Sequence, residues 1–151
     1  MAALAALRGR LALLAVIGAG GATGTAARYG TELAIEPGSD AYPAATFLVN
    51  VVGAVILGAV AELPREWLLA HELTQSAIGT GFCGGLTTFS TMTLEIHGLW
   101  PAHPEIATAY AATSLAAAIA CARAGSLLVQ TMRAISRSRR PPRAQSEGDK
   151  M

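Results

Sequence analysis

Residues 81–93, Gly-Phe-Cys-Gly-Gly-Leu-Thr-Thr-Phe-Ser-Thr-Met-Thr, place three glycines and five hydroxyl side chains inside a segment otherwise apolar enough to cross a lipid bilayer. Glycines loosen a helix, and lipid offers no hydrogen-bond partner for the backbone groups that are freed. Such a break persists only where protein, water or a bound ion satisfies those groups. The segment therefore predicts a broken membrane helix with an ion or substrate site at the break.

The composition is that of an integral membrane protein. Of the 151 residues, 52% are hydrophobic and only 14% are charged, whereas an average soluble domain has about 25% charged residues. Four stretches lack charge for long enough to span hydrocarbon roughly 30 Å thick, which takes about 20 helical residues. They are residues 11–27, 44–61, 73–94 and 106–122 or beyond. We therefore predict an all-α membrane protein of four transmembrane helices with a broken third helix.

Basic residues mark one side of this predicted bundle. Arg8 and Arg10 precede the first span, Arg65 lies in the second loop, and a basic cluster follows the fourth span from residue 133 onward. The loops on the opposite side hold only Arg28. The positive-inside rule therefore predicts a multi-pass protein of the inner membrane with both termini in the cytoplasm.

Three regions follow from this arrangement. We predict a cytoplasmic N-terminus at residues 1–10, a four-helix transmembrane domain at residues 11–132, and a basic, disordered cytoplasmic tail at residues 133–151. The basic and apolar N-terminus also resembles a cleaved signal peptide that ends near residues 25–27. Its apolar run is longer than a typical signal core, and further spans follow it, so a membrane span is the favoured interpretation.

The polar residues inside the spans are neutral. No Asp, Glu or His lies in the middle of a predicted span, which argues against a proton-coupled carrier. Asn50 either donates its carboxamide to an anion or makes an interhelical hydrogen bond. The hydroxyls of residues 87–93 either line a polar path or bond back to their own helix. The Phe89 ring edge is electropositive and suits an anion, and Arg28 is expected to serve as a structural anchor at the membrane boundary.

Other features predict packing rather than chemistry. Gly20-x-x-x-Gly24 is a pattern of small residues that lets two membrane helices approach closely. Cys83 and Cys121 lie in different spans without metal-ligand spacing, so neither a disulfide nor a zinc site is expected. The chain has no Gly-rich phosphate loop and no catalytic triad order. We expect neither an enzyme nor a nucleic-acid-binding protein.

Three motifs together resemble the small fluoride channel family, Fluc/CrcB. They are Gly20-Gly21-x-x-Gly24-x-x-x-Arg28-Tyr29, then Asn50 within Phe-Leu-Val-Asn-Val-Val-Gly, and residues 81–92. The match covers all four predicted spans. The resemblance implies an antiparallel dimer with two pores, through which fluoride leaves the cytoplasm passively and selectively. It thereby implies a lower cytoplasmic fluoride concentration.

The resemblance also assigns roles by motif position. It implies that the backbone carbonyls of Gly84 and Thr87 hold a central structural sodium ion. The implied fluoride pore consists of a carboxamide, an aromatic edge, neighbouring hydroxyls and a hydroxyl track on the fourth span. Its residues are Asn50, Phe89, Ser90, Thr91, Met92, Tyr110 and Ser114.

This sequence departs from the family pattern at two of its positions. Met92 stands where the pattern has a second phenylalanine, so one electropositive ring edge is missing. Ala118 stands at the third hydroxyl position of the fourth span. Both departures predict an altered pore.

The uneven distribution of basic residues bears on the partner. An antiparallel dimer made from one gene requires a chain that inserts both ways, and hence nearly balanced basic residues. The partner is therefore either a second copy or a homologous chain of opposite topology. Two other functions are alternatives, a small multidrug-type exporter and a structural membrane subunit without transport. The first normally needs a carboxylate at a span centre, and neither explains the Thr-Thr-Phe-Ser-Thr run.

Overall fold

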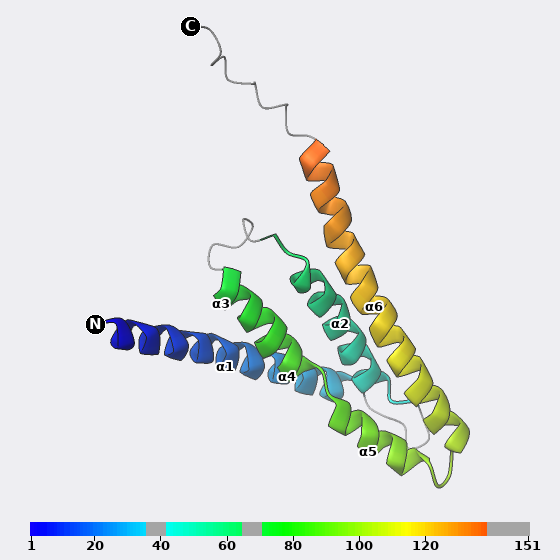
Figure 1. Ribbon diagram of the computed structural model, residues 1–151. Coiled ribbons are helices and arrows are strands. Elements are labelled where there is room, and N and C mark those ends of the chain that lie inside the picture. The colour runs from blue at the N-terminus through cyan, green and yellow to red at the C-terminus, as the bar shows by residue number, and fades with distance from the viewer. Residues whose placement is uncertain (36–41, 65–70, 139–151) are drawn as a thin grey trace, which may run out of the picture.

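The computed structural model describes residues 1–35, 42–64 and 71–138, and every element in this part of the chain is helical (Figure 1). The fold class is therefore all-α, as predicted. The elements in chain order are α1 (Ala2–Ala34), α2 (Ala44–Ala61), α3 (His71–Gln75), the π-helix η2 (Ser76–Cys83), α4 (Gly84–Leu86), α5 (Phe89–Leu99) and α6 (Pro104–Ser138).

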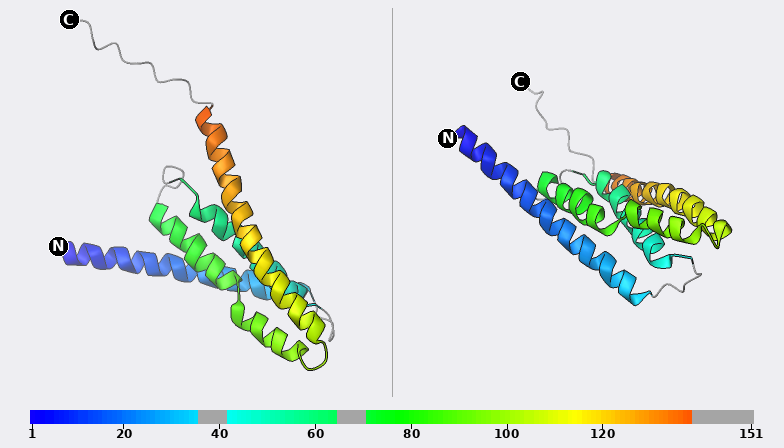
Figure 2. Two further views of the ribbon diagram at one scale, coloured as in Figure 1. Left: turned by 45° about the vertical axis from the view of Figure 1, so that its right-hand side comes forward. Right: turned by 90° about the horizontal axis from the view of Figure 1, so that it is seen from below.

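Two helix pairs organise the bundle. Helix α2 packs along α6, and α1 packs along η2 and α4. The start of α1, the end of α2, the start of α3 and the end of α6 lie at one end of the bundle (Figure 1). Helix α5 runs beside the first part of α6 and is offset from the axis of α3 and α4 (Figure 2).

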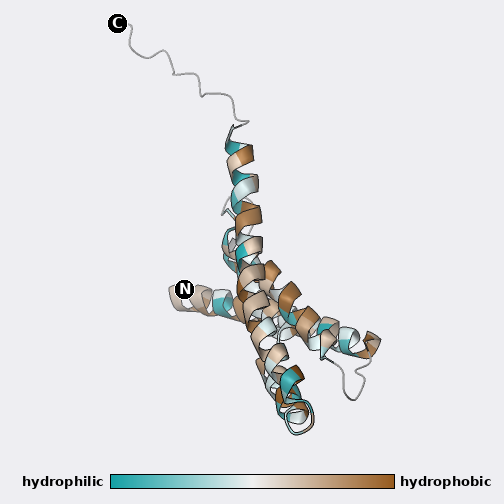
Figure 3. Ribbon diagram, turned by 90° about the vertical axis from the view of Figure 1, so that its right-hand side faces the viewer, coloured by the Kyte–Doolittle hydropathy of each residue, from teal (hydrophilic) through white to brown (hydrophobic). Residues whose placement is uncertain are grey.

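Three of the described helices, α1, α2 and α6, are long and apolar enough to cross a membrane. Their outward surfaces carry large apolar side chains, such as Leu14, Leu115 and Ile119, each at least 60% exposed. Along α6 the apolar colour dominates the middle, and hydrophilic turns lie toward the ends (Figure 3). This pattern is expected of helices that face lipid rather than water.

The segment predicted as the third span consists of several elements. Between α4 and α5, Thr87 and Thr88 have extended backbone conformations, with φ and ψ of −80° and 152° at Thr87 and −147° and 125° at Thr88. The glycines that suggested a break lie inside helical elements, so the non-helical residues follow the glycines rather than include them. Unexpectedly, the eight residues before α4, Ser76–Cys83, form a π-helix.

The glycines serve close approach between α1 and this segment. A β-carbon at Gly20 would overlap the carbonyl oxygen of Ala77, and one at Gly24 would overlap the carbonyl oxygen of Phe82. On the facing side, a β-carbon at Gly85 would overlap the carbonyl oxygen of Gly21. The packing role predicted for Gly20-x-x-x-Gly24 is confirmed. Only glycine permits two backbones to lie this close together.

The helices extend beyond the predicted limits of the spans. Helix α1 begins at Ala2, so the predicted N-terminal segment 1–10 is helical. Helix α6 continues to Ser138, so the predicted disordered tail is wrong for residues 133–138. Residues 133–138 contain neither glycine nor proline, and Arg and Ala are favourable in helices, which is consistent with this continuation. The remainder of the predicted tail, residues 139–151, and Arg65 lie outside the described residues.

Candidate functional site

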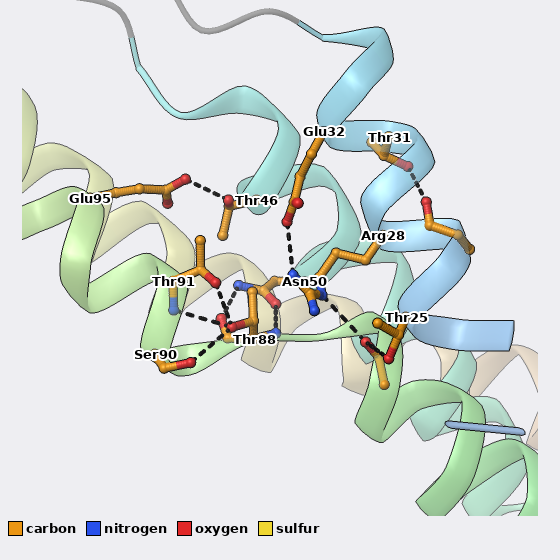
Figure 4. A network of polar contacts seen from close by, with 12 residues as sticks. Thr25, Arg28, Thr31, Glu32, Thr46, Asn50, Thr88, Ser90, Thr91 and Glu95 are labelled. Atoms are coloured by element: carbon orange, nitrogen blue, oxygen red, sulfur yellow. Dashed lines mark hydrogen bonds and ion pairs between the residues drawn. The ribbon is translucent and has the colours of Figure 1, made fainter. Parts of the chain in front are cut away.

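Asn50 of α2 closes the gap between α4 and α5. Its Oδ1 accepts a hydrogen bond of 2.8 Å from the Thr88 backbone N–H, and its Nδ2 donates one of 3.0 Å to the Thr88 carbonyl oxygen (Figure 4). The Thr88 N–H would otherwise lack a partner, whereas its carbonyl, at the N-cap of α5, also accepts the first bond of that helix. The interhelical role, one of the two left open for Asn50, is therefore observed. A carboxamide has two N–H donors, and the second has no partner among the described residues.

Thr88 also caps the helix that follows it. Its hydroxyl accepts from the Thr91 backbone N–H at 3.2 Å and lies 3.0 Å from the Thr91 hydroxyl and 3.3 Å from that of Ser90. A threonine with extended backbone is a favoured N-cap, because its oxygen satisfies an N–H at the helix start. The hydroxyls of Ser90 and Thr91 thus belong first to a capping network on α5.

Two carbonyl groups at the gap remain open. The Thr88 N–H that would normally bond to the Gly84 carbonyl is taken by Asn50, and Thr91 bonds to a hydroxyl instead of the Thr87 carbonyl. In the described part of the chain, no hydrogen bond reaches the carbonyl oxygen of Gly84 or Thr87. Carbonyl oxygens are hard ligands that suit cations without soft character. The two residues assigned to sodium therefore fit such an ion by their chemistry.

Arg28 lies on the other side of the same segment. Its Nε donates to the Gly85 carbonyl oxygen at 3.4 Å, and its Nη1 pairs with Glu32 at 2.9 Å. The hydroxyl of Thr25 also lies 3.5 Å from the Gly85 carbonyl oxygen. A cation near the C-terminal end of a helix offsets its dipole. These contacts place Arg28 where a structural role is expected of it.

A groove of roughly 410 Å³ opens beside the gap. It lies between residues of α2, η2, α4, α5 and α6, and its lining is mainly apolar with a few polar groups. At its edge Phe89 is 77% exposed. The groove brings together six of the residues assigned to the pore or to sodium, and also Ala118. The six are Asn50, Gly84, Thr87, Phe89, Met92 and Ser114.

Ser114 carries the most informative hydroxyl of this groove. Its side chain is only 5% exposed, and its Oγ has no hydrogen-bond partner among the described residues. A hydroxyl buried without a partner is unfavourable and rare. Ser114 also lines the groove, so a rotation of its side chain would bring this buried hydroxyl to a ligand there.

The sequence did not indicate a role for Glu95, whose carboxyl group lies near this region. Glu95 of α5 accepts a hydrogen bond of 2.7 Å from Thr46 and another of 2.7 Å from the Tyr110 hydroxyl. Thr46 is 1% exposed and Tyr110 is 0% exposed. Tyr110 therefore contacts Glu95 and does not line the groove, unlike its expected neighbour Ser114.

The spacing of residues in the sequence is consistent with the cluster of Thr46, Glu95 and Tyr110. Residues 46 and 50 lie one turn apart on α2, and residues 91 and 95 lie one turn apart on α5, so each pair shares a helix face. The position of Glu95 just past the predicted third span suggested a boundary residue instead. Tyr42 completes the cluster, with its ring edge-on to Tyr110 at 5.1 Å and its hydroxyl 2.7 Å from that of Thr113.

Comparisons with known proteins identify the family of the chain. Residues 15–126 match the family described as CrcB-like protein, Camphor Resistance (CrcB). The fluoride-specific ion channel FluC of Chlorobaculum tepidum is 40% identical over 116 residues, which cover 76% of this chain and 92% of that protein. Fluoride-specific ion channel FluC 2 of Streptomyces avermitilis is 40% identical over 111 residues, covering 73% and 70%. Fluoride-specific ion channel FluC 1 of Mycolicibacterium paratuberculosis is 38% identical over 121 residues, covering 80% and 92%.

Proposed function

The chain belongs to the CrcB family, and we propose that it forms a fluoride-selective channel through which fluoride leaves the cytoplasm passively. Relatives named as fluoride-specific ion channels support the ion. Within the structure, the observation that carries the proposal is the buried, unpartnered hydroxyl of Ser114 beside the groove. Passive outflow across the inner membrane would lower cytoplasmic fluoride.

The groove offers donors suited to a small anion. Fluoride is strongly hydrated, so a pore must replace its water by hydrogen-bond donors. The free N–H of Asn50, the hydroxyl of Ser114 and the ring edge of Phe89 are such donors, and all three residues line the groove. Several moderate donors let an ion enter without trapping it. Hydroxyls of Ser90 and Thr91 can join them by turning away from the Thr88 cap.

We infer that sodium holds the gap between α4 and α5. The open carbonyls of Gly84 and Thr87 would supply two of its ligands, and the ion would be structural rather than transported. Further ligands must come from elsewhere, because two oxygens do not complete the coordination of a hard cation. A second chain that presents the same two carbonyls would supply them.

A second chain also explains the exposure of the groove. Phe89 is 77% exposed at its edge, and the described residues leave this side uncovered. We propose an antiparallel dimer. In each chain, α3, η2, α4 and α5 together form the predicted third span, which is discontinuous. The partner is a second copy or a homologous chain of opposite topology. Met92 and Ala118 alter one wall of the pore in either arrangement.

The alternative of a proton-coupled exporter has one observation in its favour. Glu95 is a carboxyl group bonded inside the bundle, of the kind such a mechanism requires. Its two partners are neutral hydroxyls that hold it in place. Uptake of protons coupled to export of a cationic compound, lost in Glu95→Gln, would support this alternative. The names of the relatives favour the channel.

Fluoride efflux from liposomes tests the proposal. The purified chain, alone or reconstituted with a homologous partner, should release fluoride with a potassium ionophore present, as measured with a fluoride electrode, and should release chloride far more slowly. Ser114→Ala removes the unpartnered hydroxyl and should lower fluoride efflux at least tenfold. Thr108→Val is the matched control, because Thr108 is exposed and bonds to its own helix. Absence of efflux from this chain, alone and together with a homologous partner, would refute the channel.

A further inference from the structure

A second cavity extends the groove toward the end of the bundle that holds both termini of the described chain. It measures roughly 360 Å³ and lies between α2 and the start of η2. Leu57, Gly79 and Thr80 line both this cavity and the groove beside Asn50. The two are therefore neighbouring cavities that share one wall, and together they extend from Gln75 to the gap at Thr88.

Polar side chains without partners follow this extension. Gln75, Ser76 and Thr80 line the second cavity. None of the three side chains makes a hydrogen bond within the described residues. Ser76 and Thr80 lie on the same side of η2, four residues apart.

Most other exposed threonines among the described residues behave differently. Apart from Thr25, each donates its hydroxyl to a carbonyl of its own helix, three or four residues earlier. They are Thr23, Thr93, Thr108, Thr113 and Thr131. A hydroxyl that faces lipid needs such a bond, because lipid supplies no partner. The free hydroxyls of Ser76 and Thr80 therefore indicate surroundings that contain water or another polar partner.

The π-helix accounts for the free hydroxyl of Thr80. In η2 the backbone bonds join residues five apart, so the turns are wider than in an α-helix. The carbonyl four residues earlier is displaced from the place where a serine or threonine side chain reaches it in an α-helix. The eight-residue π-helix thus leaves the Thr80 hydroxyl free beside the cavity, whereas an α-helix would have bonded it internally. π-Helical turns often occur at functional sites.

We propose that Gln75, Ser76 and Thr80 line a hydrated approach through which fluoride travels between the aqueous phase and Asn50. Their hydroxyl and amide donors replace part of the water of the ion before it reaches the apolar part of the groove. The proposal rests on the proposed conduction of fluoride. In the competing interpretation, a helix of a partner chain covers the same groove. The experiment below distinguishes a covered groove from a hydrated one.

Cysteine accessibility tests the approach. Thr80→Cys is made in a Cys121→Ala parent, which keeps Cys83 at 2% exposed. A cationic methanethiosulfonate added in water should modify the thiol introduced by T80C within minutes and reduce fluoride efflux at least fivefold relative to the parent. Leu128→Cys, on the outward face of α6, should stay unmodified. If the parent conducts and the thiol of the T80C variant is not modified, a partner chain or lipid covers the groove and the approach is refuted.

Conservative variants supply an independent readout. Thr80→Val with Ser76→Ala removes both hydroxyls at nearly constant volume and should lower the maximal efflux rate at least threefold. Thr80→Ser retains the hydroxyl and should retain the rate. Unchanged efflux in the double variant would refute the role of these hydroxyls while leaving the fluoride channel intact. A parent without any efflux, both alone and together with a homologous partner, would refute the channel itself.

Discussion

At the scale of single residues, Asn50 has two tasks with one carboxamide. It bonds both backbone groups of Thr88, whose N–H the break inside the membrane would otherwise leave unsatisfied. Its remaining N–H is directed to no protein group among the described residues. A side chain with only one donor and one acceptor could close the gap but could not serve an anion as well.

Two substitutions separate these tasks. Asn50→Asp retains an acceptor for the Thr88 N–H but loses both N–H donors and adds a negative charge. We expect it to abolish fluoride efflux, by at least a factor of one hundred, while the chain still folds. Asn50→Ala leaves the Thr88 N–H unpaired and should also cost about 1–3 kcal/mol of stability.

The checks are liposome efflux and the thermal midpoint of unfolding in detergent. Unchanged efflux in Asn50→Asp would remove Asn50 from the pore. An unchanged midpoint in Asn50→Ala would show that the gap is held by other contacts.

The hydrogen-bonding role of Glu95 is visible only in the three-dimensional structure. Thr46 is fully buried, and its hydroxyl bonds to Glu95 at 2.7 Å. Thr46→Val keeps the shape of the side chain but removes this donor, so we expect a loss of about 1–3 kcal/mol. Thr46→Ser retains the donor and should lose less. Thermal unfolding in detergent measures both, and equal midpoints for the two variants would contradict the contribution of the hydrogen bond.

The residues of the site differ in how far the sequence predicts them. Asn50 stands out because a carboxamide is rare in an apolar span and demands partners. Glu95 does not, because a charge next to a predicted span normally marks its end. Its role depends on Thr46 and Tyr110, which lie far away in the sequence.

At the scale of elements, the contact between α1 and η2 depends on backbone approaching backbone. A methyl group at Gly24 would overlap the Phe82 carbonyl oxygen and also meet the Leu86 backbone nitrogen at 2.9 Å. Neither neighbour is the mobile end of a side chain. The two elements must therefore move apart to admit any larger residue.

Alanine substitutions along α1 should consequently have opposite effects. Gly24→Ala should lower stability by about 2 kcal/mol or more, since core overpacking typically costs about 1–3 kcal/mol and here the backbone itself must shift. Gly18→Ala, in the same helix with no atom within 4 Å of the added carbon, should raise stability by about 0.5–1 kcal/mol. Thermal midpoints of the two variants provide the test, and a stable Gly24→Ala would contradict the packing.

The elements themselves follow largely from hydrophobic patterning. Charge-free runs predicted the helices α1, α2 and α6, and the Gly-rich segment predicted an interruption. Its location at Thr87 and Thr88 could not be predicted from the glycines, because the same residue type permits either a loose backbone or a close contact. Only the position of α1 decides between these uses. The π-helix likewise has no sequence signal that separates it from an α-helix.

At the scale of the whole molecule, the uncovered groove and the unbonded carbonyls of Gly84 and Thr87 are both explained by contact with a second chain. If sodium joins Gly84 and Thr87 of two chains, its removal should weaken the dimer as well as conduction. Replacing sodium by a large organic cation during purification should lower the thermal midpoint by several degrees and reduce efflux. Restoring sodium, but not potassium, should reverse both changes. A chain insensitive to this exchange would leave the carbonyls without the proposed ion.

The distribution of charge predicts how the chain enters the membrane. Every Lys and Arg except Arg28 lies near or beyond the span ends on one side, and Arg133 contacts Glu62 at the end of α2. By the positive-inside rule, such an imbalance of basic residues sets the orientation of the chain in the membrane. We therefore expect a single orientation with the C-terminus in the cytoplasm, which an antiparallel pair of identical chains does not allow.

Reporter fusions at the C-terminus measure this orientation directly. Green fluorescent protein should fluoresce at that position, and alkaline phosphatase, which requires export, should be inactive. Fluoride efflux from cells that express the chain alone should then be weak and should rise with a homologous chain of opposite charge bias. Moving basic residues to the loop that follows α1 should produce both orientations and rescue efflux by the chain alone. Activity of both reporters in the unmodified chain would instead support a dimer of identical chains, since each copy would then insert in either direction.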